Sequence, residues 1–381
     1  MAFVFKKQIF GFMDLLRFKK MVKIRREKFA LAPAIPIPAT YKVNETAKIL
    51  HPGYFKGKLV QIDLETPDTK TYTFETSVPF YFRAGQYATL GCKVGESLVS
   101  RPYAISSSPE QALSKKVSFT VKKCGFFSDY LFDEAKVGDV FTIGDPSGEF
   151  CYEPLKDSKN ILAIAGGSGI TPFYSMAQAI KDGTINCNLT VLYGARTEKD
   201  LILREKFEAL LSDKCRIVYV LSDEKKAGYE NGFIGADIIR RYAPDDFTVM
   251  MCGPQAMYDF VNKELSSFDL PAKRIKREAN CVGVRDVADA EYQITVHIGF
   301  NTYKIKASAK ETVLTAMERA GLNAPAKCRA GGCGFCHSKL VSGKFSLAGA
   351  DKRRLADKKF GYLHPCCSYP DSDMEIIVPK A

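Results

Sequence analysis

The chain has few histidines and no long apolar segment. Four histidines in 381 residues leave little scope for a zinc site that mixes cysteine with histidine. No apolar run approaches the roughly 20 residues that a membrane span requires. The net charge is +12, but no recognised nucleic-acid-binding motif accompanies it, so nucleic acid is not an expected partner. The 12 cysteines are therefore the most informative residues.

Four cysteines near the C-terminus have the spacing of ligands to a plant-type [2Fe-2S] cluster. They are separated by 4, 2 and 29 residues, and the first three lie in CRAGGCGFC. The glycines of this segment let backbone N–H groups turn toward sulfur and spread the negative charge of a cluster. The expected metal ligands are Cys328, Cys333, Cys336 and Cys366.

Other uses of these cysteines fit less well. Zinc favours two CxxC pairs, and this chain has one. A disulfide framework is typical of short secreted chains. Cys367 is a rival fourth ligand, although the spacing from Cys336 and the following SYP favour Cys366. His337 and His364 flank the cysteines, but four thiolates already fill the coordination, so we expect them beside the cluster.

Length and cysteine content limit the organisation and the compartment. With 381 residues, 46% of them hydrophobic, the chain is expected to form two to three domains, at about 100–200 residues per domain. Twelve cysteines without a recognisable signal peptide favour a reducing compartment, and we expect a cytoplasmic protein.

The positive charge is concentrated at the N-terminus. Residues 1–28 hold nine Lys and Arg against Asp14 and Glu27, which leaves +7 in this segment. Its mixture of apolar and cationic residues predicts a basic amphipathic helix, which either contacts a membrane surface or an acidic partner, or packs on its own domain. The following ALAPAIPIPATY predicts a stiff linker, so residues 1–50 are expected to precede the folded body.

Residues 51–155 are predicted to form a small antiparallel β-barrel. Strand-like runs KGKLVQIDLE, TKTYTFET, KKVSFTVKK and DVFTIGD are separated by Pro, Gly and Asp at short intervals. Within them, RPYAISSSP offers an arginine for a phosphate, a tyrosine for a flat ring, and small residues that allow close approach. GFFS opens a predicted helix with Ser128 as N-cap, whose first N–H groups would face an anion.

Residues 156–278 alternate apolar strands with helices, which predicts a parallel-sheet nucleotide domain. The turn GGSGIT follows a buried strand and precedes a helix, so a pyrophosphate would lie at the helix N-terminus. The turn is not GxGxxG and therefore departs from the standard dinucleotide fingerprint. CGP at residues 252–254 ends another strand at the same carboxyl edge of the sheet.

These motifs, in this order, resemble the ferredoxin-NADP reductase superfamily. Its members carry a flavin barrel with RxYS and GxxS, then a nucleotide domain with GGxGxTP and CGP. Residues 314–370 resemble the cluster-binding part of plant-type ferredoxins. The whole resembles the reductase components of multicomponent oxygenases, such as those of phenylacetyl-CoA epoxidase and 3-ketosteroid 9α-hydroxylase. The resemblance implies an FAD-binding barrel at 51–155, an NAD(P)-binding α/β domain at 156–278, a linker at 279–290 and an α+β (β-grasp) ferredoxin domain at 291–381.

The resemblance also implies roles for residues of the barrel. Arg101 would bind flavin phosphate, and Pro102 and Tyr103 would pack on the flavin. Ala104 replaces the family serine that contacts flavin N5, so that contact comes from a backbone N–H, from Ser106, or is absent. The pyrophosphate is assigned to Gly125 and Ser128. The GxxS segment favours FAD over FMN.

In the nucleotide domain the resemblance implies a site for nicotinamide and pyrophosphate. Arg196 would meet either the 2′-phosphate of NADPH or the bridging phosphates. Glu198 and Asp200 nearby would repel a 2′-phosphate, so NADH is favoured over NADPH. The other residues implied are Gly166, Gly167, Gly169, Thr171, Cys252 and Gly253, with Thr171 and Cys252 near the nicotinamide.

The expected reaction joins a two-electron donor to a one-electron acceptor. NAD(P)H releases a hydride, a [2Fe-2S] cluster accepts single electrons, and a flavin converts between them. The reaction takes place on the cofactors, so no side chain is nominated as an acid or base. The chain is predicted to pass electrons from NADH to FAD, to the cluster and to an external metalloenzyme or carrier. The alternative is an electron-transfer or redox-sensing subunit that is active only within a larger complex.

A second basic segment surrounds the cluster motif. Between Lys327 and Lys359 there are nine Lys and Arg against Asp351 and Asp357, which gives +7. Either this is a solvated face, or it docks a partner that carries an acidic patch, and association would then slow as salt rises.

Overall fold

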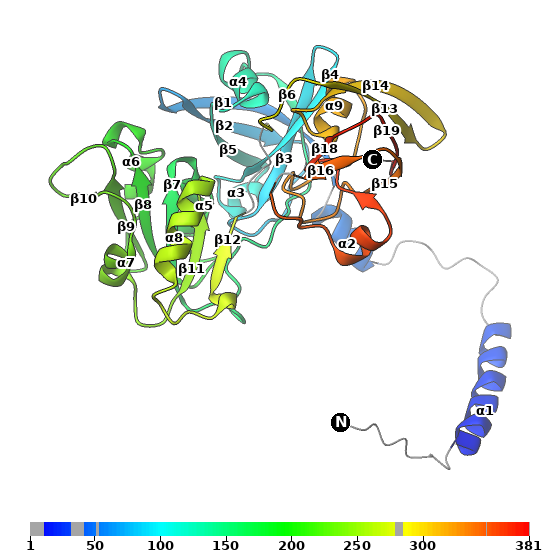
Figure 1. Cartoon of the computed structure of the whole chain (residues 1–381). Coiled ribbons are helices and arrows are strands. Elements are labelled where there is room, and N and C mark those ends of the chain that lie inside the picture. Colours follow the sequence, from blue (N-terminus) through cyan, green and yellow to red (C-terminus); the bar gives the residue numbers. More distant parts are fainter. Residues whose placement is uncertain (1–10, 32–41, 51–52, 279–284, 348, 381) are drawn as a thin grey trace. The chain divides into compact units, whose positions relative to one another are not determined.

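The protein is described from a computed structural model that covers residues 11–31, 42–50, 53–278, 285–347 and 349–380 (Figure 1). Residues 32–41 of the predicted proline-rich linker and residues 279–284 of the predicted linker at 279–290 lie outside these residues. The chain divides into two units, Met1–Ala47 and Lys48–Ala381.

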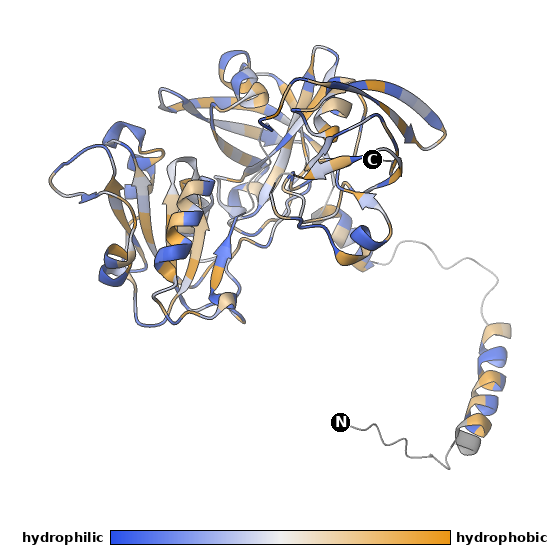
Figure 2. Ribbon diagram, viewed as in Figure 1, coloured by the Kyte–Doolittle hydropathy of each residue, from blue (hydrophilic) through white to orange (hydrophobic). Residues whose placement is uncertain are grey.

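The N-terminal unit contains the predicted basic helix. Helix α1 spans Gly11–Ala30, and α2 spans Lys42–Leu50 at the junction of the two units. Apolar and cationic residues alternate along α1 (Figure 2). Among the described residues, no helix combines the length and the apolar character that a bilayer span needs.

The first sheet of the second unit is the predicted antiparallel barrel, with strand order β4-β3-β6-β1-β2-β5. A bridge between Ile105 and Phe119 joins its two end strands. Its interior is filled by aromatic side chains such as Phe74, which meets Phe119 and Phe141 edge to face. The strands are β1 (Phe55–Thr66), β2 (Thr69–Thr76), β3 (Tyr87–Val94), β4 (Ser97–Ala104), β5 (Lys116–Lys122) and β6 (Val140–Ile143).

Two short helices complete the barrel, α3 (Pro109–Leu113) and α4 (Phe126–Asp133). Helix α3 begins with a capping box, in which Ser108 and Gln111 satisfy each other's backbone N–H groups. Helix α4 begins after Gly125, whose φ of 114° is accessible chiefly to glycine. The predicted N-cap at Ser128 is therefore wrong, because the helix starts one turn earlier.

The second sheet confirms the predicted parallel nucleotide domain. Every pair of neighbouring strands is parallel, and the order is β10-β9-β8-β7-β11-β12. The chain leaves β7 in one direction and returns to its other side, so the strand order reverses there, where ligands of such sheets bind. The strands are β7 (Asn160–Gly166), β8 (Asn188–Ala195), β9 (Cys215–Leu221), β10 (Glu230–Asn231), β11 (Thr248–Cys252) and β12 (Ile275–Arg277).

Helices cover both faces of this sheet, which is why β7 reads as the nearly continuous apolar run NILAIAG. One face packs against α5 through Phe173 and Met176, and the other against α7 and α8 through Ile239 and Val261. The helices are α5 (Thr171–Lys181), α6 (Arg204–Glu208), α7 (Ala236–Tyr242) and α8 (Gln255–Leu265), with 3₁₀ turns at Gly167–Ile170, Glu198–Asp200 and Ala272–Arg274.

The C-terminal sheet has the mixed order β14-β13-β19-β15-β17, in which β13 and β19 are parallel and the other pairs antiparallel. Helix α9 packs on it through Leu314 and Met317, as expected for the predicted α+β domain. The elements are β13 (Glu291–Ile298), β14 (Asn301–Ser308), α9 (Val313–Arg319), β15 (Ser338–Ser342), β16 (Phe345–Leu347), α10 (Leu355–Lys359), β17 (Tyr362–Leu363), β18 (Ser368–Pro370) and β19 (Met374–Val378).

Polar contacts hold the barrel against the nucleotide domain. Ser175 and Gln178 of α5 each donate a hydrogen bond of 2.7 Å to the carbonyl oxygens of Ser107 and Ser106. Lys206 of α6 pairs with Glu65 of β1 at 2.6 Å. These contacts fix the two walls of the pocket described next.

Candidate functional site

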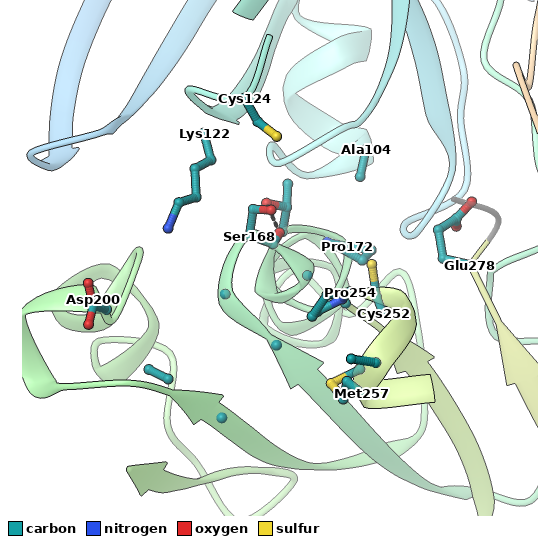
Figure 3. Close-up of a pocket in the computed structure, with 18 of the residues that line it drawn as sticks. Ala104, Lys122, Cys124, Ser168, Pro172, Asp200, Cys252, Pro254, Met257 and Glu278 are labelled. Carbon is teal, nitrogen blue, oxygen red and sulfur yellow. Dashed lines mark hydrogen bonds between the residues drawn. The ribbon is translucent and has the colours of Figure 1, made fainter. Parts of the chain in front are cut away.

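A pocket of about 1280 Å³ lies between the barrel and the carboxyl edge of the parallel sheet. Figure 3 shows Ala104, Lys122 and Cys124 on the barrel side, and Ser168, Pro172 and Cys252 on the side of the sheet. The predicted site residues that line it are Pro102, Tyr103, Ala104, Gly166, Gly167, Gly169, Thr171, Arg196, Cys252, Gly253 and Cys328. The fold therefore brings most of the predicted residues of three sequence regions to one cavity.

The glycine-rich turn lies on the sheet side of this pocket. The strand β7 ends at Gly166, a 3₁₀ turn follows, and α5 begins at Thr171, so the free N–H groups at the helix start lie beside the cavity. Gly169 lies directly against the end of β11, because a Cβ there would be 1.9 Å from the carbonyl oxygen of Cys252. A side chain at Gly169 would force the two strand ends apart, which explains the glycine without any ligand.

Two acidic residues near Arg196 bear on the choice between NADH and NADPH. Asp200 lines the pocket with Arg196, and its carboxylate accepts hydrogen bonds from Thr197. Glu198 is paired with Arg204 and Lys226, and the hydrogen bonds it accepts lower its pKa to about 2. Since two cations balance Glu198, repulsion of a 2′-phosphate would come chiefly from Asp200, and the preference for NADH stays a prediction.

Sequence reasoning missed Glu278. This residue follows the last strand of the sheet and lines the pocket together with Cys252. Burial, and to a lesser extent the charge of Glu278, raises the pKa of Cys252, so its thiol stays protonated. Lys122 and Phe233 also line the pocket. These residues carry no local motif, and only the closure of the fold brings them to the cavity.

On the barrel side, Tyr103 and Ala104 lie at the end of β4. The ring of Tyr103 stacks on Phe127, with centroids 6.3 Å apart and an interplanar angle of 23°. Ser106, one candidate donor to flavin N5, is buried and does not line the pocket, although the structure describes it fully. Of the three predicted alternatives, a contact from a backbone N–H near Ala104 or the absence of any contact to flavin N5 then remains.

Arg101, Gly125 and Ser128 are all described by the structure, and none of them lines the pocket. The Ser128 hydroxyl donates to the carbonyl oxygen of Gly125 and accepts from the N–H of Cys124, both at 2.8 Å. It therefore shapes the loop at the start of α4, next to the pocket residue Cys124. Arg101 forms an ion pair with Glu318 of helix α9 at 2.9 Å. Their roles in cofactor binding stay predictions.

The four predicted cluster cysteines lie together as two pairs. The thiol of Cys333 hydrogen-bonds to Cys328, and that of Cys336 to Cys366. Among the described residues, no group of three or more His, Cys, Asp or Glu is placed to hold a metal ion. Two pairs are instead the donor set of a two-iron cluster with four cysteine ligands.

The electrostatics of these thiols suit metal binding. A hydrogen bond from the Cys336 thiol lowers the pKa of Cys366 to about 3, and one from Cys333 lowers that of Cys328 to about 5. Within each pair the hydrogen bond favours the thiolate form of the accepting sulfur, which is the form that binds metal. The pKa of Cys367 is raised because its thiol hydrogen-bonds to Cys366, so it keeps its proton. The pKa values of Cys333 and Cys336 are raised in the same way, so the choice of Cys366 over Cys367 stays a prediction from the spacing.

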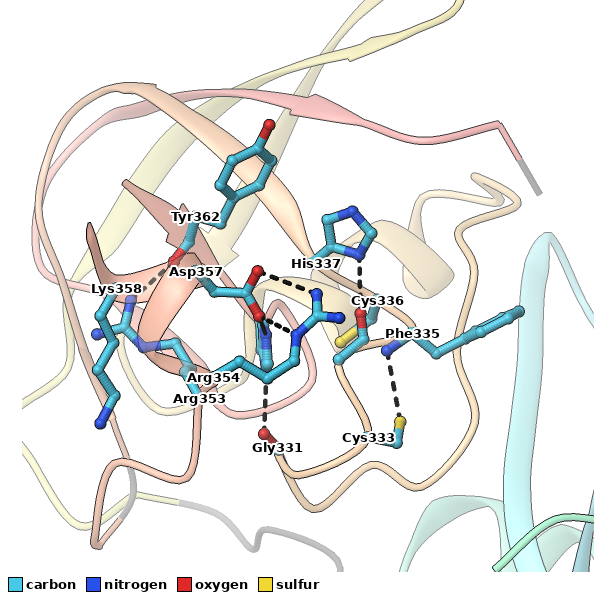
Figure 4. A network of polar contacts seen from close by, with 12 residues as sticks. Gly331, Cys333, Phe335, Cys336, His337, Arg353, Arg354, Asp357, Lys358 and Tyr362 are labelled. Carbon is cyan, nitrogen blue, oxygen red and sulfur yellow. Dashed lines mark hydrogen bonds and ion pairs between the residues drawn. The ribbon is translucent and has the colours of Figure 1, made fainter. Parts of the chain in front are cut away.

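Backbone and histidine contacts shape the loop around the cysteines (Figure 4). The N–H of Phe335 donates to the Cys333 sulfur at 3.5 Å, and His337 Nδ1 donates to the Gly334 carbonyl at 2.8 Å. His364 is completely buried: its Nδ1 donates to the Gly331 carbonyl, and its Nε2 lies 3.0 Å from Asp357. With both ring nitrogens engaged, His364 supports the loop and is not a metal ligand.

The cluster loop reaches the pocket at one end and solvent at the other. Cys328 is buried and lines the pocket that also contains Tyr103, Ala104 and Cys252. Cys333, five positions later, is exposed, and so is the neighbouring Phe335. A cluster held by these cysteines would therefore lie between the pocket and the protein surface.

The two adjacent cysteines give a direct test of the ligand set. We expect Cys366→Ser to abolish the cluster, since it removes one thiolate of a pair, and Cys367→Ser to retain it. Visible absorption and the electron paramagnetic resonance (EPR) spectrum of the reduced protein would measure this, with iron content as a check. A cluster that survives in the first variant and is lost in the second would reverse the assignment.

Sequence models of three protein families match the chain in the order of its three sheets. The Oxidoreductase FAD-binding domain matches residues 56–152, the Oxidoreductase NAD-binding domain residues 163–263, and the 2Fe-2S iron-sulfur cluster binding domain residues 296–371. These matches confirm the predicted FAD, NAD and [2Fe-2S] cofactors.

Whole-chain comparisons give the same domain combination. The glycine betaine monooxygenase reductase subunit of Chromohalobacter salexigens is 29% identical over 354 residues, which cover 85% of this chain and 95% of that protein. The ferredoxin reductase component of 3-ketosteroid-9-alpha-monooxygenase from Rhodococcus rhodochrous is 28% identical over 330 residues, with coverage of 81% and 92%. A solved structure of phthalate dioxygenase reductase is similar in fold, with a TM-score of 0.63, 20% identity and coverage of 86% of this chain and 98% of that chain. The chain thus joins an Oxidoreductase FAD-binding domain and an Oxidoreductase NAD-binding domain to a C-terminal 2Fe-2S iron-sulfur cluster binding domain, which confirms the predicted resemblance to reductases of the ferredoxin-NADP reductase superfamily.

Proposed function

We propose that the protein is an NADH-dependent reductase that passes electrons through FAD and a [2Fe-2S] cluster to an external metalloenzyme. The observation that carries this proposal is the shared pocket, in which Cys328 of the cluster loop lies with Tyr103 and Ala104 of the barrel and Cys252 of the sheet. The proposed sites for NADH, FAD and the [2Fe-2S] cluster thus meet in one cavity. The matched relatives named as monooxygenase reductase components support an oxygenase as the terminal acceptor.

Bound FAD supplies the conversion of a two-electron hydride into single electrons that a cluster accepts. The chain's own residues provide position. The turn from Gly166 to Thr171 and the start of α5 offer backbone N–H groups to the nucleotide phosphates. Tyr103, backed by Phe127, offers a flat surface to a ring, and the largely apolar walls exclude water.

Separating the two halves of the electron path tests this function. We expect Cys328→Ser to remove the cluster signal and to leave NADH-dependent ferricyanide reduction largely intact, because the flavin and nucleotide residues lie on the other two domains. Purified protein should contain one flavin and two irons per chain, measured by absorption and metal analysis. A wild-type protein whose cluster is not reduced by NADH would contradict the function, whereas turnover that needs an added partner would favour a subunit of a larger complex.

We also propose that the acceptor docks beside the exposed end of the cluster loop, on a surface called here the docking patch. It consists of Phe335, Lys352, Arg354, Leu355, Lys359 and Phe360, all of them exposed. Lys327 lies over the Phe335 ring at 4.7 Å and adds charge at its edge. The patch combines apolar anchors with cations, which suits a partner with an acidic patch around an apolar centre.

The structure reduces the number of cations that the basic segment from Lys327 to Lys359 contributes to this patch. Arg329 is buried against Glu318, and Arg353 is paired with Asp351 at 2.9 Å, so neither contributes a free surface charge. Arg354 is paired with Asp357 but remains 55% exposed. The docking patch therefore relies on fewer cations than the sequence count implied.

Charge reversal in the docking patch is expected to weaken acceptor reduction. Lys352→Glu with Lys359→Glu should lower the rate with the acceptor about three- to tenfold at low salt and flatten its dependence on ionic strength. The matched control is Lys304→Glu on β14. In the C-terminal sheet, β14 forms the edge opposite to β17, the strand that follows the docking patch in sequence. Stopped-flow kinetics with the acceptor encoded beside the chain would measure both. Equal effects of the patch and control variants would argue against this surface.

We propose further that helix α1 contacts an anionic surface. Leu15, Phe18, Val22 and Phe29 follow one another at intervals of 3, 4 and 7 residues, which places them on one helix face. Arginines and lysines flank this face. Such a helix suits the interface of a membrane that contains anionic lipid.

Vesicle binding distinguishes a membrane contact from a protein contact. The full chain should co-sediment with vesicles of mixed phosphatidylserine and phosphatidylcholine and not with phosphatidylcholine alone. Phe18→Glu with Phe29→Glu should remove most of this binding, while Leu155→Glu, at a 94% exposed position of the second unit, should not. Wild-type protein that stays in the supernatant with anionic vesicles would leave an acidic protein as the partner.

A further inference from the structure

A buried carboxylate joins the ferredoxin domain to the flavin barrel. Glu318 lies in the last turn of α9, and its side chain is only 8% exposed. Its Oε2 is 2.9 Å from Nη1 of Arg101, and its Oε1 pairs with Nη2 of Arg329 and accepts a 3.2 Å hydrogen bond from the N–H of Ser100. We call Glu318, Arg101, Arg329 and Ser100 the interdomain clamp.

The clamp connects three segments that are far apart in sequence. Arg101 and Ser100 belong to β4 of the barrel, Glu318 to α9, and Arg329 to the cluster loop. Helix α9 lies beside β4 (Figure 1). The chain just after α9 also approaches the chain just before β4, since a Cβ at Gly321 would be 2.9 Å from the carbonyl oxygen of Glu96.

The charges of the clamp make Glu318 its necessary member. One carboxylate bridges two guanidinium groups, and the Arg329 side chain is 7% exposed. Without the carboxylate, the buried guanidinium of Arg329 would face the partly exposed guanidinium of Arg101 with no anion between them, which costs more than the loss of a surface ion pair. The barrel and the cluster loop are thus held together through Glu318.

The clamp also fixes the backbone next to a cluster ligand. Arg329 follows Cys328 directly and has a φ of 51°, a left-handed conformation that a residue other than glycine adopts only when its contacts hold it there. The pairing with Glu318 supplies such a contact. Since Cys328 lines the pocket, the clamp determines where the cluster loop meets the flavin site.

We propose that Glu318 is a positioning residue that anchors the cluster loop to the barrel and holds Cys328 at the pocket. This inference rests on the proposed function for its kinetic consequence, whereas its structural consequence can be tested independently. Nη1 of Arg101 carries the bonds to Glu318 and to the carbonyl oxygen of Ser100. A guanidinium has further donors on Nη2 and Nε, so Arg101 can serve the clamp and a flavin phosphate together.

The first test is hydrogen exchange of the full-length holoprotein with Glu318→Gln. The Ser100 amide and the amides of residues 327–331 should exchange at least about tenfold faster, because their partner has lost its charge. Glu311→Gln is the matched control, since Glu311 pairs with Arg319 at 2.5 Å within the ferredoxin domain. Unchanged protection in Glu318→Gln, or equal loss of protection in both variants, would overturn the proposal.

The second test compares two steps of electron flow in the same variants. In Glu318→Gln, the EPR signal of the reduced cluster should appear at least about tenfold more slowly after mixing with NADH, relative to the rate of flavin bleaching, because the loop no longer holds its place. In Glu311→Gln this ratio should stay at the wild-type value. A wild-type ratio in Glu318→Gln would overturn the positioning role.

A second variant, on the barrel side, keeps the test valid if Glu318→Gln loses its cluster. Arg101→Gln breaks the clamp at a residue remote from every cluster ligand in sequence. Residues 327–331 should lose protection in it while the cluster spectrum is retained, whether or not FAD stays bound. Wild-type protection of residues 327–331 from hydrogen exchange in Arg101→Gln would contradict the clamp. If NADH fails to reduce the wild-type cluster, the proposed function is wrong. The hydrogen-exchange data would still show whether Glu318 anchors the cluster loop to the barrel.

Discussion

The position of Cys328 at the edge of the flavin pocket is the constraint on which the rest of the structure depends. Single electrons pass between carriers only when the carriers lie close together, and here three domains contribute walls to one cavity. The barrel and the nucleotide domain meet through α5 and Lys206, and the ferredoxin domain meets the barrel through Glu318. Both contacts are polar and specific, so they fix orientation in addition to holding the domains together.

The chemistry of each site follows from local backbone geometry. In the nucleotide domain, helices bury the largely apolar strands on both faces of the sheet, so binding groups gather at the strand ends. Gly169 allows the ends of β7 and β11 to touch, which shapes the floor of the pocket. In the cluster loop, Gly331 has a φ of 77°, its carbonyl receives the buried His364, and its N–H lowers the pKa of Cys366. In the cluster loop, as at the strand ends of the nucleotide domain, backbone groups contribute more than side chains to the surroundings of the negative charge.

Much of this arrangement could be predicted from sequence because the signals are local. Strands β1, β2, β5 and β6 of the barrel and β7, β8, β9 and β11 of the parallel sheet lie at the predicted runs. The spacing of four cysteines predicted the cluster ligands, and the structure gathers these four residues. Local signals failed where a neighbour in space decides the outcome. Glu278, for example, reaches the pocket only through the closure of the sheet. The predicted start of α4 is wrong for a local reason, because the positive φ of Gly125 lets the helix begin right after it. The basic segment looked like one charged surface, although Arg329 is internal.

The sequence by itself determined the order of the three domains and the cofactors, and it predicted the four cysteines that the structure brings together in two pairs. These depend on spacings of a few residues and on patterns along single elements, which a chain displays before it folds. Only the tertiary structure decided that Arg101 meets Glu318, that Cys328 faces the flavin pocket and that Cys333 faces solvent. Arg101 and Glu318, for example, are more than 200 positions apart in the sequence. The physical reason is that packing, not distance along the chain, decides which charges and thiols become neighbours.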